Sequence, residues 1–229
     1  MNETGLLSVI IPAYNAARYL ADAIESIFAQ GYHPLELIVV NDGSSDNTAE
    51  VAQSFGSAIQ YIHQPNGGIA LALNRGLDAA QGEWLAFCAA DDRWAEKRLE
   101  TQFAAFAANP KPDLVFGHVQ NFFSPEISDM ITRRYHCPPD PLPGFSLAAM
   151  LLRRNTFERV GTFNTEFKIG EFVDWYARAM DLELTSVLLP DIVLWRRLHG
   201  ENLSIRSANA RSDFARILKA SLDRRRPKR

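Results

Sequence analysis

Polar side chains that can bind ligands or metals follow three apolar segments of this sequence, at Asn15, Asp42 and Asp91. Asp42 comes soon after residues 37–40 (Leu-Ile-Val-Val), a short β-branched run that is typical of a buried parallel strand. A polar turn follows, whose side chains can cap a helix. Open α/β sheets bind ligands at the carboxyl ends of their strands, so Asp42 is a candidate binding residue. Alone, the stretch also fits an ordinary capped turn, and the neighbouring segments decide between the two interpretations.

Strand-like and helix-like segments alternate through the first half of the chain. The apolar runs predict five strands, at residues 6–12, 37–40, 58–63, 84–88 and 113–117. Apolar residues at helical spacing predict the helices between them, at residues 16–28, 48–52, 69–80 and 99–106. This alternation predicts an α/β fold, with a mostly parallel sheet flanked by helices. The carboxyl ends of parallel strands meet at one edge, so Asn15, Asp42 and Asp91 should converge there.

The second half of the chain is less regular. Residues 122–143 are rich in proline and show no periodic pattern. The remaining apolar patterns predict helices at residues 147–152, 156–160, 171–180 and 212–219. Residues 184–195 predict a strand that is broken at Pro190-Asp191.

Composition argues against several classes of protein. The formal net charge of −3 does not suit a general nucleic-acid binder. No apolar run is long enough for a transmembrane helix, and the polar first residues do not resemble a signal peptide, so a cytoplasmic location is expected. The cysteines are Cys88 and Cys137. Cys88 lies in an apolar strand pattern and should be buried, which argues against a disulfide framework or a zinc site.

Four successive segments together resemble the family 2 glycosyltransferases, which adopt the GT-A fold. They are residues 9–15 (Val-Ile-Ile-Pro-Ala-Tyr-Asn), residues 41–44 (Asn-Asp-Gly-Ser), residues 66–68 with 74–76, and residues 82–94, which end in Ala-Asp-Asp-Arg-Trp. Weaker similarity continues through residues 161–164 and 171–178. The resemblance implies one compact GT-A domain. Its parts would be a nucleotide-sugar-binding half at 1–117, an acceptor-binding and catalytic half at 118–206, and a helix with a basic tail at 207–229.

The resemblance also implies ligands and roles. A nucleotide-sugar donor, a UDP-sugar in the first instance, would lie at the carboxyl edge of the sheet. Asp91 would belong to the motif that holds Mg2+ or Mn2+ on the donor diphosphate, and such ions often take only one or two carboxylate ligands. Residues implied in donor binding are Pro12, Ala13, Tyr14, Asn15, Asp42, Asn66, Gly67, Gly68, Asn74, Asp91, Arg196 and Arg197.

Three positions depart from the family pattern. Ala89 stands where the metal motif often has its first aspartate, so metal affinity without nucleotide should be poor. Leu73 replaces an arginine that often precedes the asparagine of the third segment. Phe172 stands where many relatives carry an aspartate that acts as the catalytic base. Ala89 and Phe172 motivate an alternative, in which the chain is a catalytically impaired nucleotide-sugar-binding module.

The carboxylates beside Phe172, Glu171 and Asp174, are the candidate bases for an inverting displacement. They are three residues apart on a predicted helix and therefore share one face, where either could accept a proton from the acceptor. The competing interpretation is structural. Asp174 would pair with Arg178 one turn later, and Glu171 would favour the helix N-terminus.

His199 is the second candidate metal ligand, because imidazole is a common ligand that suits Mn2+. Residues 196–202 resemble a late segment in which several GT-A enzymes add a histidine to the metal site. Arg196 and Arg197 would then hold the leaving diphosphate. The alternative is a solvated basic loop.

The sequence leaves the acceptor open among a saccharide, a lipid-linked saccharide and a peptide, because residues 119–155 contain no motif. The basic run at residues 224–229 either touches anionic lipid or is solvated, and solvation is the commoner fate of such a terminus. A nucleotidyltransferase ranks last, because those enzymes usually have a glycine-rich basic loop after the first strand, and residues 12–15 do not.

Overall fold

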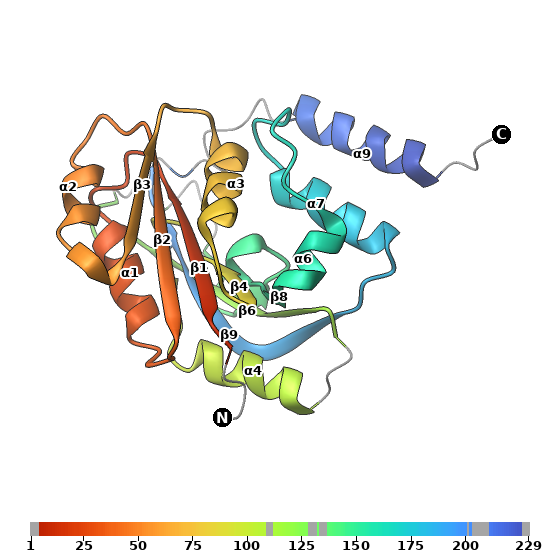
Figure 1. Cartoon of the computed structure of the whole chain (residues 1–229), viewed down its shortest axis with the longest axis horizontal. Helices are drawn as coiled ribbons and strands as arrows, with labels where there is room; N and C mark the ends of the chain where they lie inside the picture. Colours follow the sequence, from red (N-terminus) through yellow and green to blue (C-terminus); the bar gives the residue numbers. More distant parts are fainter. Residues whose placement is uncertain are drawn as a thin grey trace.

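One twisted sheet runs through the molecule, with the strand order β3-β2-β1-β4-β8-β6-β9-β5 and β7 paired to β6 (Figure 1). The computed structural model describes residues 5–108, 112–127, 132, 137–200, 202 and 211–225. The fold is the predicted α/β architecture, a single domain with a mostly parallel, curled sheet and flanking helices.

The first half of the chain forms the parallel part of the sheet. β1 pairs in parallel with β2 on one side and with β4 on the other, and β3 pairs in parallel with the far edge of β2. Because these strands run in one direction, the turns after them open at the same edge, as predicted. The strands are β1 (Leu7–Ala13), β2 (Leu35–Asp42), β3 (Gln60–Gln64) and β4 (Trp84–Phe87).

Helices cover both faces of this parallel unit (Figure 1). Alternate residues of β1 face opposite sides, so Val9 and Ile11 join the core under α1 and α4 while Ile10 joins the core under α3. The close approach of α3 requires Gly76, where a Cβ atom would lie 2.5 Å from Ile10 Cγ2. The helices are α1 (Leu20–Phe28), α2 (Thr48–Gln53), η1 (Gly56–Ala58), α3 (Ile69–Ala79) and α4 (Arg98–Ala108).

The second half extends the same sheet. β8 is antiparallel to both of its neighbours, β4 and β6, whereas β9 is parallel to β6 and antiparallel to β5. β6 continues across residue 117, so the predicted halves share a strand, and their division by function remains a prediction. The strands are β5 (Arg93–Trp94), β6 (Leu114–Phe123), β7 (Leu142–Pro143), β8 (Leu151–Arg153) and β9 (Ser186–Leu198).

Two predictions for this half are wrong. Residues 147–152 do not form a helix, because only Leu147–Ala149 make a 3-10 turn (η2) before β8 begins. The strand at 184–195 is not broken at Pro190. β9 runs through that residue, with register shifts against β6, and continues to Leu198. Arg196 and Arg197 of the expected basic loop are therefore strand residues at the carboxyl end of β9, and His199 directly follows the strand.

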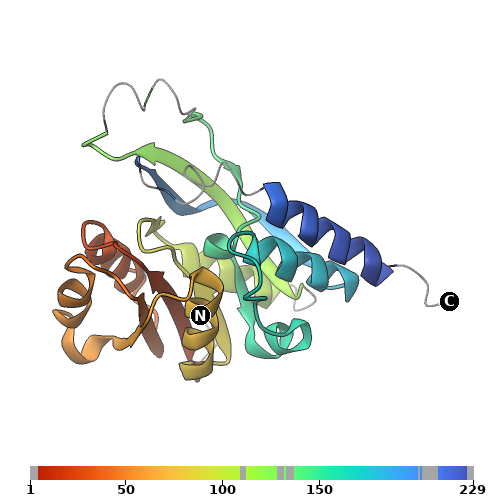
Figure 2. The ribbon, with the colours of Figure 1, turned by 90° about the horizontal axis from the view of Figure 1, so that it is seen from above.

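Three helices complete the fold: α6 (Arg154–Val160), α7 (Glu171–Asp181) and α9 (Arg211–Arg225). The inward face of α7 carries Trp175 and Ala179, both fully buried, as its sequence pattern predicted. α9 lies alongside α7 at the rim of the molecule (Figure 2). Within the residues described, no helix is long and apolar enough to cross a membrane.

A buried arginine joins α4 to the middle of the sheet. Arg98 is fully buried and donates to Gln102 Oε1 at 3.0 Å and to the backbone oxygens of Ala148 and Met150 at 2.5 and 3.2 Å. Its guanidinium also stacks 4.0 Å from the ring centroid of Trp94. Burial lowers the pKa of Arg98 to about 9. These bonds hold the segment before β8 against α4.

Candidate active site

The turn after β1 is built by contacts with the turn after β2. The backbone N–H of Asn15 donates to Ser44 Oγ at 2.9 Å, and Asn15 Oδ1 accepts from the backbone N–H of Ser45 at 2.8 Å. Asn15 has a positive φ of 49°, a conformation that asparagine tolerates better than most residues. Its side chain is thus part of the scaffold, whereas the neighbouring Tyr14 is 54% exposed at the sheet edge.

Asp42 organises the glycine loop that precedes α3. One carboxylate oxygen accepts from Gln64 Nε2 and from the N–H of Gly67, and the other accepts from the N–H of Gly68, all at 2.8 Å. The carboxylate is 4% exposed. Three of the predicted donor-binding segments therefore meet at one edge through Asn15, Asp42 and this loop.

Two hollows flank the sheet. One, of about 450 Å3, is lined by Gln64, Pro65, Asn66, Gly67, Leu71, Asn74, Arg75 and Asp78, and so contains three of the predicted donor-binding residues. The other, of about 600 Å3, lies among α1, β5, α4 and β9 and is lined by none of the predicted site residues. The smaller hollow is the one that fits the predicted site.

The two predicted metal ligands lie side by side. His199 Nε2 is 2.9 Å from Asp91 Oδ2, and Asn202 Nδ2 donates to the same oxygen at 3.0 Å. Asn202 Oδ1 also accepts from the backbone N–H of His199 at 2.7 Å. Asn202 therefore joins both residues, although sequence reasoning did not select it. The sequence could have indicated Asn202 through its position three residues after the candidate ligand His199.

This pair suits a hard divalent cation. Two ligands in neighbouring positions of an octahedral Mg2+ or Mn2+ shell lie roughly 3 Å apart, close to the observed separation of the Asp91 and His199 atoms. The described residues contain no cluster of three or more histidine, cysteine or acidic side chains, so the remaining ligands would come from the donor diphosphate and water. That donor set agrees with the expectation that metal binds poorly without nucleotide.

Arg197 holds the metal-motif turn in place. Its side chain is 7% exposed. Nη2 donates to Asp22 Oδ2 at 2.7 Å, and Nε donates to the backbone oxygen of Asp91 at 3.0 Å. The guanidinium lies between the rings of Tyr19 and Phe122, 4.7 and 4.9 Å from their centroids. These contacts occupy the group that was expected to hold the diphosphate, so the geometry favours a positioning role for Arg197.

Asp92, next to the predicted ligand, is a buried structural carboxylate. Its Oδ1 accepts the backbone N–H of Arg197 at 2.9 Å. Burial, together with the negative charge of Asp91, raises the pKa of Asp92 well above its usual value. Arg196 precedes Arg197 on β9, and successive strand side chains point to opposite faces, so Arg196 is the arginine of the pair that lies outside this buried contact.

Tyr19 connects this centre to the segment after β6. Its ring lies 4.8 Å from the ring of His199, and its hydroxyl bonds the carboxylate of Glu126, which also pairs with Arg18 at 3.2 Å. Tyr19 and Asp22 both come from the start of α1, and no motif in the sequence had marked them. Only the structure identifies them as part of the site, because the fold places them against β9.

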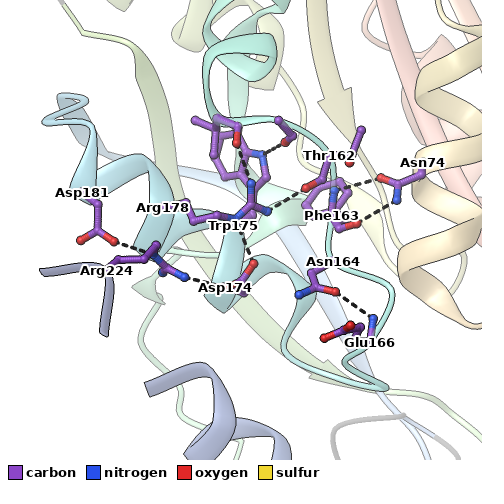
Figure 3. A network of polar contacts seen from close by, with 12 residues as sticks. Asn74, Thr162, Phe163, Asn164, Glu166, Asp174, Trp175, Arg178, Asp181 and Arg224 are labelled. Atoms are coloured by element: carbon purple, nitrogen blue, oxygen red, sulfur yellow. Dashed lines mark hydrogen bonds and ion pairs between the residues drawn. The ribbon is translucent and has the colours of Figure 1, made fainter. Parts of the chain in front are cut away.

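Asn74 has a structural partner. Its side-chain amide donates to the backbone oxygen of Phe163 at 2.9 Å and accepts the N–H of Phe163 at 3.0 Å (Figure 3). This two-point contact ties α3, which begins at the glycine loop, to the segment that leads into α7. Donor contact through this amide was expected from the resemblance, but the group is committed to Phe163.

The two candidate bases have different environments. Asp174 is buried and pairs with Arg178 at 2.9 Å, as the structural alternative predicted, and with Arg224 of α9 at 3.6 Å (Figure 3). Arg178 also donates to the backbone oxygens of Val160 and Thr162. Glu171, the first residue of α7, is half-buried; desolvation raises its pKa, an effect that backbone hydrogen bonds partly offset.

Phe172 belongs to the aromatic core beside these carboxylates. Its ring lies 5.6 Å from Tyr176 and 6.3 Å from Phe116. The position that carries a carboxylate in many relatives is thus used for packing. Of the two candidate bases, Glu171, the first residue of α7, is the one that is only half-buried.

The family model described as "Glycosyl transferase family 2" matches residues 8–170 of the chain, from β1 to the start of α7. The chain belongs to glycosyl transferase family 2. An uncharacterized glycosyltransferase of Rickettsia felis is 30% identical over 221 residues, which cover 89% of this chain and 36% of the relative. The glycosyltransferase GlyG of Streptococcus pneumoniae is 36% identical over 121 residues, 51% of this chain and 40% of that protein.

Solved structures of other proteins share the fold. TarS of S. aureus in complex with UDP-GlcNAc superposes with a TM-score of 0.76 at 18% identity, covering 95% of this chain and 66% of that chain. The mannosyltransferase PcManGT of Pyrobaculum calidifontis, in complex with GDP-Man and Mn2+, gives a TM-score of 0.73 at 20% identity, covering 99% and 66%. The chain spans 36% and 40% of the lengths of the R. felis and S. pneumoniae relatives.

Proposed function

We propose that this family 2 glycosyltransferase chain transfers a sugar from a nucleoside-diphosphate sugar to a nucleophilic acceptor, with inversion and with Mg2+ or Mn2+. The observation that carries the proposal is the contact between Asp91 and His199 at the carboxyl edge of the sheet. The structural neighbour that contains GDP-Man and Mn2+ supports the same class of ligand.

In this proposal the donor lies along the edge formed by the turns after β1, β2 and β3. Asn74 and Arg197 are assigned to positioning rather than donor contact, because their polar groups bond the protein itself. Arg196 keeps the proposed role at the diphosphate. The side chains of Asn15 and Asp42 also bond neighbouring loops, so these two residues are likewise assigned to positioning. The other proposed contacts are Pro12, Ala13, Tyr14, Asn66, Gly67, Gly68 and Asp91.

Glu171 is the proposed base. Its carboxylate accepts the proton of an acceptor hydroxyl as that oxygen bonds to the anomeric carbon, while the bond from this carbon to the donor diphosphate breaks with its electron pair. The partly buried position keeps the carboxylate basic enough for this task. When bound, the divalent ion would neutralise the charge on the departing diphosphate. Asp174 is assigned to structure.

Calorimetric titration with UDP, GDP, CDP and dTDP, each with and without Mn2+, tests the proposal. One nucleotide should bind tightly and in a metal-dependent way, and Asp91→Ala should abolish that dependence. Glu158→Ala is the matched control, because Glu158 is an exposed carboxylate of α6 outside the site. If Asp91→Ala binds the nucleotide with undiminished metal dependence, the assignment of Asp91 is wrong.

The second candidate is a catalytically impaired nucleotide-sugar-binding module, which Ala89 and Phe172 favour. It predicts metal-dependent nucleotide binding without turnover. Donor hydrolysis or transfer above the rate of the Glu171→Gln variant would exclude this candidate. The acceptor is proposed to be a saccharide, a lipid-linked saccharide or a peptide.

A further inference from the structure

An apolar stripe of three partly exposed side chains runs along α9. Phe214, Leu218 and Leu222 follow one another at spacings of four residues and are 45%, 61% and 52% exposed. Ile217 and Ser221 lie on the neighbouring side of the helix and are buried. α9 therefore contacts the domain with one side and presents three large apolar side chains on another.

Polar contacts with the domain fix the orientation of α9. Asp181 of α7 accepts from Arg224 at 2.9 Å (Figure 3). It also accepts from Arg225 at 2.6 Å. Near the other end, the backbone N–H of Lys168 donates to Asp213 Oδ2 at 3.1 Å. Ion pairs at one end and a hydrogen bond near the other thus hold α9 against the domain, in an orientation that leaves Leu218 and Leu222 more than half exposed.

The charge of this region is opposite to that of the rest of the protein. Residues 211–229 contain eight arginines and lysines and two aspartates, a net charge of +6, whereas residues 1–210 carry −9. Residues 211–225, which form α9, account for +3 of this charge, and residues 226–229 add +3. Arg216, Arg224 and Arg225 pair with Asp213 and Asp181. Exposed leucine and phenylalanine beside this remaining positive charge match the chemistry of a bilayer surface with anionic head groups.

We propose that α9 docks this protein on the surface of an anionic lipid bilayer, with Phe214, Leu218 and Leu222 in the head-group region. Figure 2 shows α9 along the rim of the molecule, where a flat surface can reach it. A second copy of the chain is the less suitable occupant. A twofold contact through α9 would place two strongly cationic helices against each other.

The location of α9 also bears on which acceptor the proposed function uses. A Cβ atom at Gly170 would lie 2.8 Å from Ile217 Cδ1 and 3.3 Å from Phe214 Cε1, so the start of the stripe packs against the residue before Glu171. A bilayer at α9 would bring Glu171 close to the lipid surface. If the proposed function holds, the acceptor is then the lipid-linked saccharide rather than a free saccharide or a peptide.

Flotation of the full chain with lipid vesicles tests the docking without donor or acceptor, so its failure is distinct from a failure of the proposed function. Vesicles of phosphatidylglycerol and phosphatidylcholine should bind the chain, and vesicles of phosphatidylcholine alone should bind it at least tenfold more weakly. The paired substitution Leu218→Ser/Leu222→Ser should reduce binding at least tenfold. Phe28→Ser, at a 38% exposed phenylalanine of α1, should leave binding unchanged.

The substituted side chains are exposed, so circular dichroism should show an unchanged fold in both variants. No binding to anionic vesicles at low salt, or equal binding by the paired variant, would overturn the proposal. Light scattering tests whether a second copy of the chain binds to the stripe instead. A dimer that dissociates in Leu218→Ser/Leu222→Ser, without vesicle binding by the unsubstituted chain, would assign the stripe to a second copy instead.

Discussion

His199 Nε2 lies 2.9 Å from Asp91 Oδ2 although 108 residues separate the two in the chain. Asp91 belongs to the turn between β4 and β5, and His199 directly follows β9, which pairs with β5. The sheet therefore determines the distance between them, and Asn202 fixes their orientation by bonding both. The first prediction concerns this third residue.

Asn202→Ala should weaken metal-dependent nucleotide binding by roughly 10- to 100-fold, because residues that orient metal ligands contribute this much to affinity. The substitution removes the donor to Asp91 and the acceptor for the His199 N–H. Calorimetry with the preferred nucleotide, with and without Mn2+, measures the effect. Binding without metal should change little. Asn155→Ala, at an exposed asparagine, is the control, and an equal loss with and without Mn2+ would refute the positioning role.

Glu171→Gln should lower turnover roughly 100- to 10,000-fold while nucleotide affinity stays unchanged, since a general base acts on the acceptor proton and not on donor binding. Steady-state rates and calorimetry on the same preparation separate the two effects. Glu183→Gln, at an exposed glutamate just after α7, should keep full activity. Retained turnover in Glu171→Gln would show that another group accepts the proton.

The pH dependence of kcat/KM should carry the signature of Glu171. Desolvation raises the pKa of this carboxyl above the ordinary value of 4.5, and only the ionised form accepts a proton. Activity should therefore rise with pH through a pKa higher than 4.5, and Glu171→Gln should lack this rise. The same shift means that the folded chain keeps a proton that the unfolded chain has released, so Glu171 reduces stability as pH rises through this window.

Asp174→Asn should destabilise the fold by about 3–5 kcal/mol, because it leaves Arg178 and Arg224 without their buried anionic partner. Urea unfolding followed by circular dichroism measures this change, with Glu183→Gln as the exposed control. Wild-type stability combined with lost turnover would instead identify Asp174 as the base.

Asn74→Ala should cost about 1–3 kcal/mol of stability, since it leaves the buried backbone groups of Phe163 without partners. Nucleotide affinity, measured well below the unfolding temperature, should change little if Asn74 only positions the α7 segment. A large loss of affinity without a loss of stability would restore the donor-binding role that the resemblance implied.

Local sequence was sufficient to predict the strands of the parallel unit, but it was insufficient to predict the strands in the rest of the sheet. The apolar runs before Asn15, Asp42 and Asp91 predicted the central strands, since buried parallel strands need little beyond apolar residues. β8 and β5 have three and two residues and exist because of the strands beside them, so no window of sequence reveals them.

For the candidate site, too, the sequence predicted some features and not others. Asp91 and His199 were available from motif resemblance, and the pairing of Asp174 with Arg178 from helical spacing. The partners of Arg197 were not available, because Asp22 is 175 residues away and Asp92 is 105 residues away in the chain. Resemblance gave residue types at positions, but only the packed sheet shows which polar groups are already occupied.

The strand order also sets when the site can form during synthesis. β3, β2, β1 and β4 are all present once about residue 88 has left the ribosome, and they pair only with one another until β8 is made. The partners that complete the metal pair come from residues 197–202. A nascent chain can thus assemble the proposed nucleotide edge well before it can hold a cation, and a chain stopped before β9 would keep Asp91 without His199.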